Sequence, residues 1–535
     1  MYDTIIRNGS IIDGTGKQRF ESDLAIKNGK IAAIGNLKRT PSKTVIDAKG
    51  CIVCPGFIDN HCHGDLNVLA DPLAQNQLLQ GITTEVAGNC GISFAPIRGE
   101  CDRMVSAQTP FLSSAEREEY YRDITFPEFM DKLEEMDLGV NLVNYIGQGI
   151  IRQNVMKYQP GKANPHQMEE MKRILQEALD AGAAGMSSGL IYPTGSLTDT
   201  EEMIELCKVV AERGKNYSTH MRNEGDSVDA ALKEAIHVAD ESGVRLIVSH
   251  HKVSGIKNHG RSVETIGIIN EAIKRGSKIF MDQYPYAEGG TMLVMGCIPK
   301  EDAADRELLI KKLENSAYRA QLAEKISNYS GERELLLISS GGPEYTMVAR
   351  APGCRNVEGK TLLKISEELG KDPYDVMFDI IQQTDSQAMG IFTLASEDDI
   401  ERIMKHPHTM FGTDASHATY CNVFSHPRAT SSFPHIIKKY VNERNVISLE
   451  EMVRKSTSLP ADVVGISNKG RLAVGMDADL VIFNNRLIQD YSTYMNPNKG
   501  NSGIKYVFIS GQIVVQDDKV TGIKAGKLIR IPNRK

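Results

Sequence analysis

The sequence of 535 residues is longer than one small core requires, so we expect at least two structural units. Hydrophobic residues make up 41% and charged residues 24%, a balance typical of soluble globular proteins, and nine cysteines scattered through so long a chain argue against a disulfide framework. The formal net charge of -7, with acids and bases interspersed and no apolar run long enough to span a bilayer, predicts a cytoplasmic protein with neither a nucleic-acid nor a membrane partner.

Both ends of the chain are rich in short strands separated by Gly and Asn turns. The N-terminal segments are TIIRNGSIID, DLAIKNGKIAAIG and KTVIDAKGCIVCPG, and the C-terminal ones are ADLVIFN, IKYVFISGQIVVQDDKV and GKLIRI. We expect residues 1–55 and 465–535 to form one small β-sandwich domain. Two unrelated edge hairpins are the alternative.

The middle of the chain alternates apolar strand-like runs with amphipathic helical ones. The helical stretches include HQMEEMKRILQEALDAG and SVDAALKEAIHVADESG. Eight strand candidates occur in one run: GFIDNHCHG, ITTEVAGNCG, VNLVNYIGQG, AAGMSSGLIYP, NYSTHMRNE, RLIVSHHKV, KIFMDQYPY and HTMFGTDAS. Repeated strand–helix units of this kind predict an α/β fold with a (β/α)8 TIM-type barrel over residues 56–464.

A charged, helix-prone stretch from Pro299 to about Arg350 interrupts this pattern before the last strand. It is too long for a plain connection, so we expect an insert, over about residues 287–350, above the mouth of the barrel. Extra helices on the outside of the barrel are the alternative.

Polar residues of metal-binding type stand at the ends of five of the predicted strands. In a (β/α)8 barrel, the C-terminal ends of the strands share one mouth, where the chemistry takes place. The residues at these ends are His61, His63, Cys90, His220, His250 and Asp414.

His61 and His63 are two residues apart, so on a strand both imidazoles point to the same face. Paired imidazoles can hold one divalent cation, although a lone pair of this kind is more often structural. With Cys90, His220 and His250 added, the set predicts a metal site, and a thiolate among imidazoles favours zinc over magnesium or calcium.

Asp414, in FGTDAS, is the candidate general base. Zinc lowers the pKa of a bound water, and a nearby carboxylate can take the proton and pass it to a departing amine. A helix cap or turn residue is the alternative for a single Asp at a strand end.

These residues lie in segments that resemble the N-acyl-D-amino-acid deacylases (D-aminoacylases) of the amidohydrolase superfamily. The likeness extends over nearly the whole chain, and its most specific parts are GNCGIS, THMRNEGD and SHHK. Other matching segments are PGFIDNHCHGD, SSGLIYPTG, DQYPY, HPRATSSFP, STSLPADVVGI and GRLAVGMDADLVIF. The resemblance implies hydrolysis of the amide of an N-acyl-D-amino acid, which would be the small-molecule partner.

The resemblance also implies roles for single residues. Cys90, His220 and His250 would hold a tightly bound Zn²⁺, and His61 and His63, with Cys90 bridging, a second and weaker one. Asp414 matches the family's catalytic aspartate. Tyr192 and Lys252 match residues that contact the substrate carboxylate.

The chain departs from relatives in places. Gly289 and Gly290 stand where relatives place a serine after YPY, and only Arg355 and Arg428 are candidates for a further anion contact.

Three other functions remain open. A cyclic-amide hydrolase of the dihydroorotase or hydantoinase kind would be expected to carry a lysine on the fourth strand, which AAGMSSGLIYP lacks. A metal-dependent deaminase would use a glutamate near His220, and Glu224 is available, but Cys90 fits that class poorly. A non-catalytic barrel that binds a partner is the third, and the intact ligand set argues against it.

Overall fold

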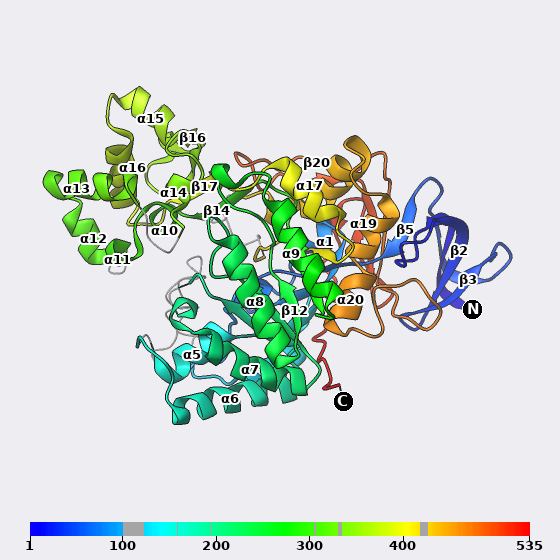
Figure 1. Cartoon of the computed structure of the whole chain (residues 1–535). Helices are drawn as coiled ribbons and strands as arrows, with labels where there is room; N and C mark the ends of the chain where they lie inside the picture. Colours follow the sequence, from blue (N-terminus) through cyan, green and yellow to red (C-terminus); the bar gives the residue numbers. More distant parts are fainter. Residues whose placement is uncertain are drawn as a thin grey trace.

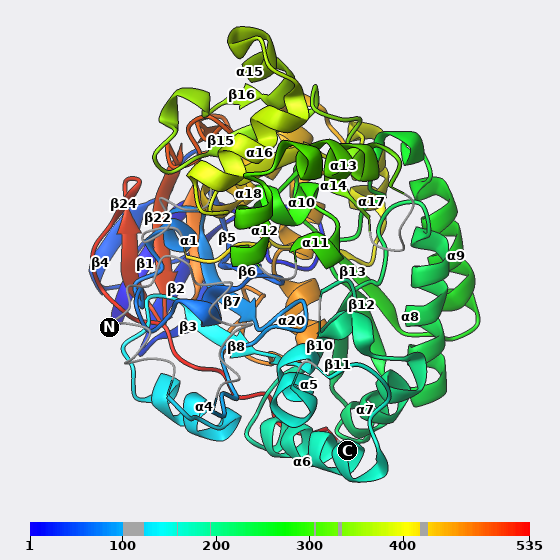
Figure 2. The same cartoon turned by 90° about the vertical axis from the view of Figure 1, so that its left-hand side faces the viewer.

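The computed structural model describes residues 1–99, 122–157, 159–192, 194–303, 306–329, 334–417 and 426–534. Figure 1 shows a sheet near the N-terminus, a central group of strands flanked by helices, and a smaller lobe to one side. In Figure 2 the side of the molecule that carries the lobe faces the viewer, and the lobe occupies the upper part of the picture, over the labels of the central strands.

One nine-stranded sheet takes strands from both ends of the chain. β19 pairs antiparallel with β5 on one side and with β22 on the other, which joins the two termini. Alternate residues of β19 enter two different cores, as the two-residue period of a strand requires. The strands are β1 (Tyr2–Ile11), β2 (Phe20–Lys27), β3 (Lys30–Gly35), β4 (Ser42–Asp47), β5 (Ile52–Pro55), β19 (Leu480–Phe483), β22 (Ile504–Ile509), β23 (Gln512–Gln516) and β24 (Lys519–Val520).

The central strands are parallel and form two sheets, β6-β7-β8 and β9-β10-β11-β12-β13-β18. Each of the eight predicted strand segments contains one of them, except VNLVNYIGQG, which contains both β8 and β9. Asn60 N donates to Phe411 O at 3.1 Å and Ala184 N to Asn144 O at 2.8 Å, so backbone hydrogen bonds link the two sheets at both edges. The bounds are β6 (Phe57–Asp59), β7 (Ile82–Ala87), β8 (Asn141–Asn144), β9 (Ile146–Gly147), β10 (Gly185–Gly189), β11 (Asn216–His220), β12 (Arg245–Val248), β13 (Ile279–Gln283) and β18 (Thr409–Phe411).

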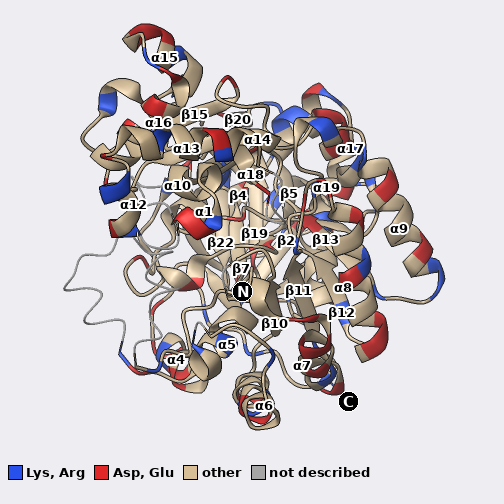
Figure 3. Cartoon of the chain, turned by 60° about the vertical axis from the view of Figure 1, so that its left-hand side comes forward, with Lys and Arg blue, Asp and Glu red and all other residues tan. Residues whose placement is uncertain are grey.

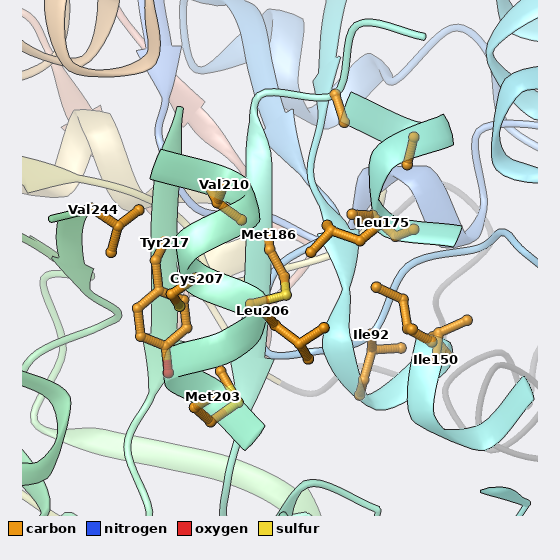
Figure 4. Close-up of a cluster of buried hydrophobic side chains, with 14 of the residues drawn as sticks. Ile92, Ile150, Leu175, Met186, Met203, Leu206, Cys207, Val210, Tyr217 and Val244 are labelled. Carbon is orange, nitrogen blue, oxygen red and sulfur yellow. The ribbon is translucent and has the colours of Figure 1, made fainter. Parts of the chain in front are cut away.

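Amphipathic helices cover these strands. In Figure 4, Leu206 and Val210 of α7 lie against Met186 of β10 and Tyr217 of β11, in a buried apolar cluster. Local signals set the helix starts: α6 begins after a capping box formed by Asn164 and Gln167. The helices are α1 (Gln75–Leu79), α4 (Phe126–Glu134), α5 (Gln148–Met156), α6 (Pro165–Asp180), α7 (Thr200–Glu212), α8 (Val228–Ser242), α9 (Ser262–Lys274), α17 (Glu397–Lys405), α18 (Arg428–His435), α19 (Leu449–Lys455) and α20 (Ser458–Val464).

The lobe lies between β13 and α17 in sequence and has its own apolar core. Its antiparallel sheet has the order β14-β17-β15-β16, so the first and last strands of the lobe are neighbours. The elements are β14 (Glu288–Met292), α10 (Leu293–Cys297), α11 (Lys300–Ala303), α12 (Arg306–Lys312), α13 (Ser316–Ser327), α14 (Leu336–Ser339), β15 (Thr346–Arg350), β16 (Lys360–Thr361), α15 (Leu362–Leu369), α16 (Pro373–Gln383) and β17 (Met389–Thr393). A short pair, β20 (Gln489–Asp490) and β21 (Asn501–Ser502), follows later in the chain.

Charged side chains of both signs are interspersed along the outer helices (Figure 3). Within the described ranges, no helix combines the length and apolar character needed to cross a membrane. The parallel strands and the helices that cover them give a fold of mixed α/β type.

Candidate metal centre and active site

The six predicted rim residues lie at or just beyond the ends of parallel strands. His61 and His63 follow β6, Cys90 follows β7, His220 ends β11, His250 follows β12, and Asp414 follows β18. Because the strands run the same way, their C-terminal ends meet at one edge. Asp414 N donates to His61 O at 2.7 Å, which joins the first and last of these segments directly.

The side chains converge around the Cys90 thiol. Its Sγ lies 3.3 Å from His61 Nε2 and 3.4 Å from His250 Nε2. Asp414 Oδ1 lies 3.2 Å from His63 Nε2 and 3.5 Å from His61 Nε2. The rings of His220 and His250 are in edge contact, with centroids 4.4 Å apart. The structure therefore brings all six predicted residues together.

Three of these residues have left-handed backbone conformations that non-glycine residues rarely adopt. The φ angles are 55° at Cys90, 34° at His250 and 48° at Asp414. Such conformations cost about 1–3 kcal/mol each and persist only where the surrounding structure enforces them. Their clustering at one edge is typical of a functional site.

The buried charges of the centre stabilise one another. Burial opposes ionisation of Cys90, but the neighbouring His61 and His250 imidazoles outweigh it and hold the pKa of the thiol well below its usual value. Burial likewise opposes ionisation of Asp414, but the Arg428 guanidinium and the neighbouring imidazoles together outweigh it and hold the pKa of that carboxyl well below its usual range. Both groups are therefore anionic at neutral pH, as a metal ligand and a base must be.

The donor set fits a zinc ion. Ligands of tetrahedral zinc bound through sulfur and nitrogen are separated by about 3.5 Å, close to the two thiol–imidazole distances here. The Nε2 atoms of His61 and His250 face Cys90, while their Nδ1 atoms lie 2.9 Å from Asp282 Oδ1 and 3.0 Å from Glu224 Oε1. Metal-binding histidines commonly have such an outer carboxylate partner.

His220 differs, because its nitrogen nearer a carboxylate is Nε2, 3.6 Å from Glu224 Oε2. Its Nδ1 lies 3.3 Å from the Tyr192 hydroxyl, and its buried Nε2 has no hydrogen-bond partner in the described part of the chain. A nitrogen buried without a partner is costly unless a ligand satisfies it. A cation held by Cys90, His220 and His250 would do so.

The two predicted substrate contacts, Tyr192 and Lys252, both border the centre. Lys252 Nζ donates to Glu224 Oε1 at 2.8 Å and to His250 O at 3.1 Å, and it lies 2.9 Å from His250 Nδ1. Burial lowers the pKa of Lys252, but Glu224 outweighs this and raises it, so the side chain stays cationic. Lys252 therefore contacts both the predicted ligand His250 and the Glu224 carboxylate that faces it.

Of the two candidate arginines, only Arg428 lies at the centre. Its Nη1 donates to Asp414 Oδ2 at 2.8 Å, and its guanidinium lies 5.1 Å from the centroid of the Tyr284 ring. Arg355 is exposed in the lobe. At Gly289, a Cβ would lie 2.3 Å from Leu394 Cδ1, so a serine does not fit there without displacing that side chain.

Two residues near the metal centre were not predicted to act there. Asp282 accepts from His250 N at 2.6 Å in addition to facing His61, and Glu224 contacts both His250 and Lys252. Glu224 had been considered only for a deaminase. The signal for Asp282 is its place in DQYPY, at the end of β13, where a polar residue interrupts a buried strand.

Comparison with known proteins identifies the family of this chain. Residues 44–515 match the amidohydrolase family. D-aminoacylase of Alcaligenes xylosoxydans xylosoxydans is 31% identical over 529 residues, which cover 99% of this chain and 97% of that protein. N-acyl-D-aspartate deacylase of the same organism is 32% identical, covering 98% and 95%.

The solved structures include N-acyl-D-glutamate deacylase from Bordetella bronchiseptica, complexed with zinc and a phosphonate inhibitor that mimics the tetrahedral intermediate of the reaction. It superposes with a TM-score of 0.81 at 29% identity and covers 99% of each chain. The resemblance predicted from the sequence is thus confirmed, and the chain belongs to the amidohydrolase family, among the relatives of D-aminoacylase.

Proposed function

We propose that this protein hydrolyses the amide bond of N-acyl-D-amino acids and depends on zinc to do so, releasing a carboxylate and a free D-amino acid. The observation that carries the proposal is the convergence of Cys90, four imidazoles and Asp414 at one edge of the parallel strands. The relatives that match over nearly the full chain are deacylases of such compounds.

Cys90, His220 and His250 would hold the tightly bound zinc, and His61 and His63 would complete a second site with Cys90. Zinc bound here supplies Lewis-acid chemistry, which polarises an acyl carbonyl and lowers the pKa of a water molecule. Glu224 and Asp282 fix the orientation of His250 and His61 from behind.

Asp414 is the group that moves protons. Its carboxylate is buried beside the imidazoles, with one oxygen toward His63 and the other toward Arg428. It takes a proton from the attacking water and delivers it to the departing nitrogen, which must leave as an amine.

Arg428 and Tyr192 are placed to orient an anionic substrate. A guanidinium can bind a carboxylate through two parallel hydrogen bonds, and the Arg428 side chain donates to Asp414 Oδ2 at 2.8 Å. Lys252 adds positive charge beside Glu224. We propose that these three side chains hold the α-carboxylate of the substrate.

We also propose that the two parallel sheets form one closed (β/α)8 barrel over residues 56–464, supported by the two backbone hydrogen bonds that link their edges. The residues 1–55 and 465–535 would form the β-domain. The insert expected at 287–350 would be the lobe, whose last strand ends at Thr393.

The test compares reaction classes on one purified sample. Stripped of metal and titrated with zinc, the protein should release amine from N-acetyl-D-amino acids in proportion to bound zinc. A hydantoin, dihydroorotate and adenine should give no turnover. Turnover of a cyclic amide or of adenine alone would overturn the proposal.

A further inference from the structure

A buried ion pair lies beside the metal centre and belongs to none of the groups assigned above. His417 Nε2 lies 2.8 Å from Glu85 Oε2, and the two side chains are 1% and 0% exposed. Glu85 is in β7, the strand that leads to Cys90, and His417 is three residues after Asp414. The pair thus connects two segments that carry active-site residues and are 332 positions apart.

The segment around His417 is also fastened to the residues that follow β6. His417 N donates to Asn67 Oδ1 at 3.3 Å, and Asn67 Nδ2 donates to His417 O at 2.8 Å. His417 Nδ1 lies 2.9 Å from Asp71 O. Its second ring nitrogen is therefore held by a backbone carbonyl, which fixes the plane of the imidazole facing Glu85.

Asp414 lies between two such attachments. On its N-terminal side, Thr413 Oγ1 donates to Asp59 Oδ2 at 2.6 Å. On its C-terminal side, His63 N donates to Ala415 O at 2.8 Å. The left-handed backbone of Asp414 is unfavourable by itself, so attachments on both sides are what keep it in place.

Gly64 shows how closely the pair lies against the histidine segment. A Cβ at this position would be 2.7 Å from both Glu85 Oε2 and His417 Nε2. No real Cβ approaches polar atoms so closely, so Gly64 leaves the space that the pair occupies. The chain immediately after His63 therefore rests directly on the two charged groups.

Stability alone does not account for this pair. A buried ion pair usually gives no more stability than apolar side chains of the same volume. Glu85 Oε1, moreover, is buried with no hydrogen-bond partner within the described residues, which costs about 1–3 kcal/mol. What an ion pair provides and an apolar contact does not is a directed bond of fixed length.

We propose that Glu85 and His417 are a positioning pair. The pair fixes the relative positions of three segments: the one that carries Asp414, the strand that leads to Cys90, and the one that carries His61 and His63. The inference rests on the proposed function. Neither residue touches the substrate, so loss of the pair should displace Asp414 and lower kcat while leaving KM nearly unchanged. Misplacement by about 1 Å can cost on the order of 100-fold in rate.

The experiment compares Glu85→Gln, His417→Gln and the double variant on zinc-loaded protein. Each single variant should lose about 10- to 100-fold in kcat, with KM within about threefold of wild type. In the double variant two amides can pair in place of the two charges, so kcat should return to within about fivefold of wild type. Zinc per chain, measured in parallel, should stay unchanged in all three.

Asp479→Asn is the matched control. Asp479 forms a buried ion pair with Lys469 at 2.6 Å and accepts from Asn141 at the start of β8, the end of the strands away from the metal centre. This variant should lower the Tm as the Glu85 variant does but leave kcat unchanged.

The outcomes distinguish failure of the positioning role from failure of the proposed function. If wild type turns over and the single variants keep full kcat, or if the double variant is no better than the singles, the positioning role is wrong. Loss of a metal equivalent in Glu85→Gln would also overturn it, because Asp59, Cys62 and Glu85 would then be ligands. If wild type itself has no turnover, the proposed function fails instead. The pair is then tested by the rate at which a chelator removes zinc, which should change in the single variants and return to the wild-type value in the double variant.

Discussion

Replacing Asp414 by Asn removes the proposed proton carrier with little change in volume. In the structure one carboxylate oxygen lies 3.2 Å from His63 Nε2 and the other accepts from Arg428 at 2.8 Å. The amide oxygen of Asn can still accept from Arg428, but an amide cannot take up a proton at neutral pH. The substitution therefore separates proton transfer from the packing of the site.

The expected loss in kcat is on the order of 10³ or more, about 4 kcal/mol in the activation barrier, because a positioned general base contributes about 10²–10⁴. The expected loss in stability is much smaller. Breaking a fully buried ion pair costs about 3–5 kcal/mol, but Asp414 is 13% exposed and Asn keeps one hydrogen bond, so we expect about 1–2 kcal/mol.

The assay measures release of free amino acid from an N-acetyl-D-amino acid, with zinc content and Tm determined on the same sample. We expect zinc to remain at the wild-type level and the Tm to fall by a few degrees. Turnover within about tenfold of wild type, with zinc bound, would refute the assignment, since another group would then carry the proton.

Further predictions follow from the same contacts. Cys90→Ala should lower the zinc content per chain, measured by metal analysis. Full zinc content in this variant would contradict a thiolate ligand. Arg428→Met should raise KM about 10- to 100-fold, the value of a lost charge-assisted hydrogen bond, in steady-state kinetics; an unchanged KM would exclude a carboxylate contact. Burial lowers the pKa of His417, but Glu85 outweighs it and raises it to about 9, above the unfolded value of about 6.5. The pair's contribution to stability is therefore complete below pH 6.5 and lost as pH rises through 9, a dependence that thermal unfolding of His417→Gln should lack.

The six candidate site residues could be predicted because the C-terminal ends of parallel strands meet at one edge. His61, His220 and Asp414 each end an apolar run, so the pattern of the sequence contains their position. The distances between them depend on a few residues beyond each strand, where the left-handed turns at Cys90 and His250 carry the side chains inward. Nothing in the pattern of hydrophobic residues indicates those turns.

Residues that act through another residue escaped prediction. In the sequence, Glu85 is only a polar residue in a strand and His417 only a loop residue. Their contact joins positions 332 residues apart, so no local pattern indicates it. Glu224 and Asp282 similarly acquire their roles only from the histidines that they orient. Pairing in the lobe had no local signal either, since β14 finds its partner β17 about one hundred residues later.

The most direct test of the central claim is the ratio of kcat/KM for enantiomeric pairs of N-acetyl-amino acids (Met, Leu, Phe, Glu and Asp), with zinc per chain determined on the same sample. We expect turnover of at least one D-enantiomer, at least 100-fold preferred over its L-counterpart, with about one tightly bound zinc per chain. Zinc-loaded protein that hydrolyses neither enantiomer of any pair, or that prefers the L-series, would contradict the claim.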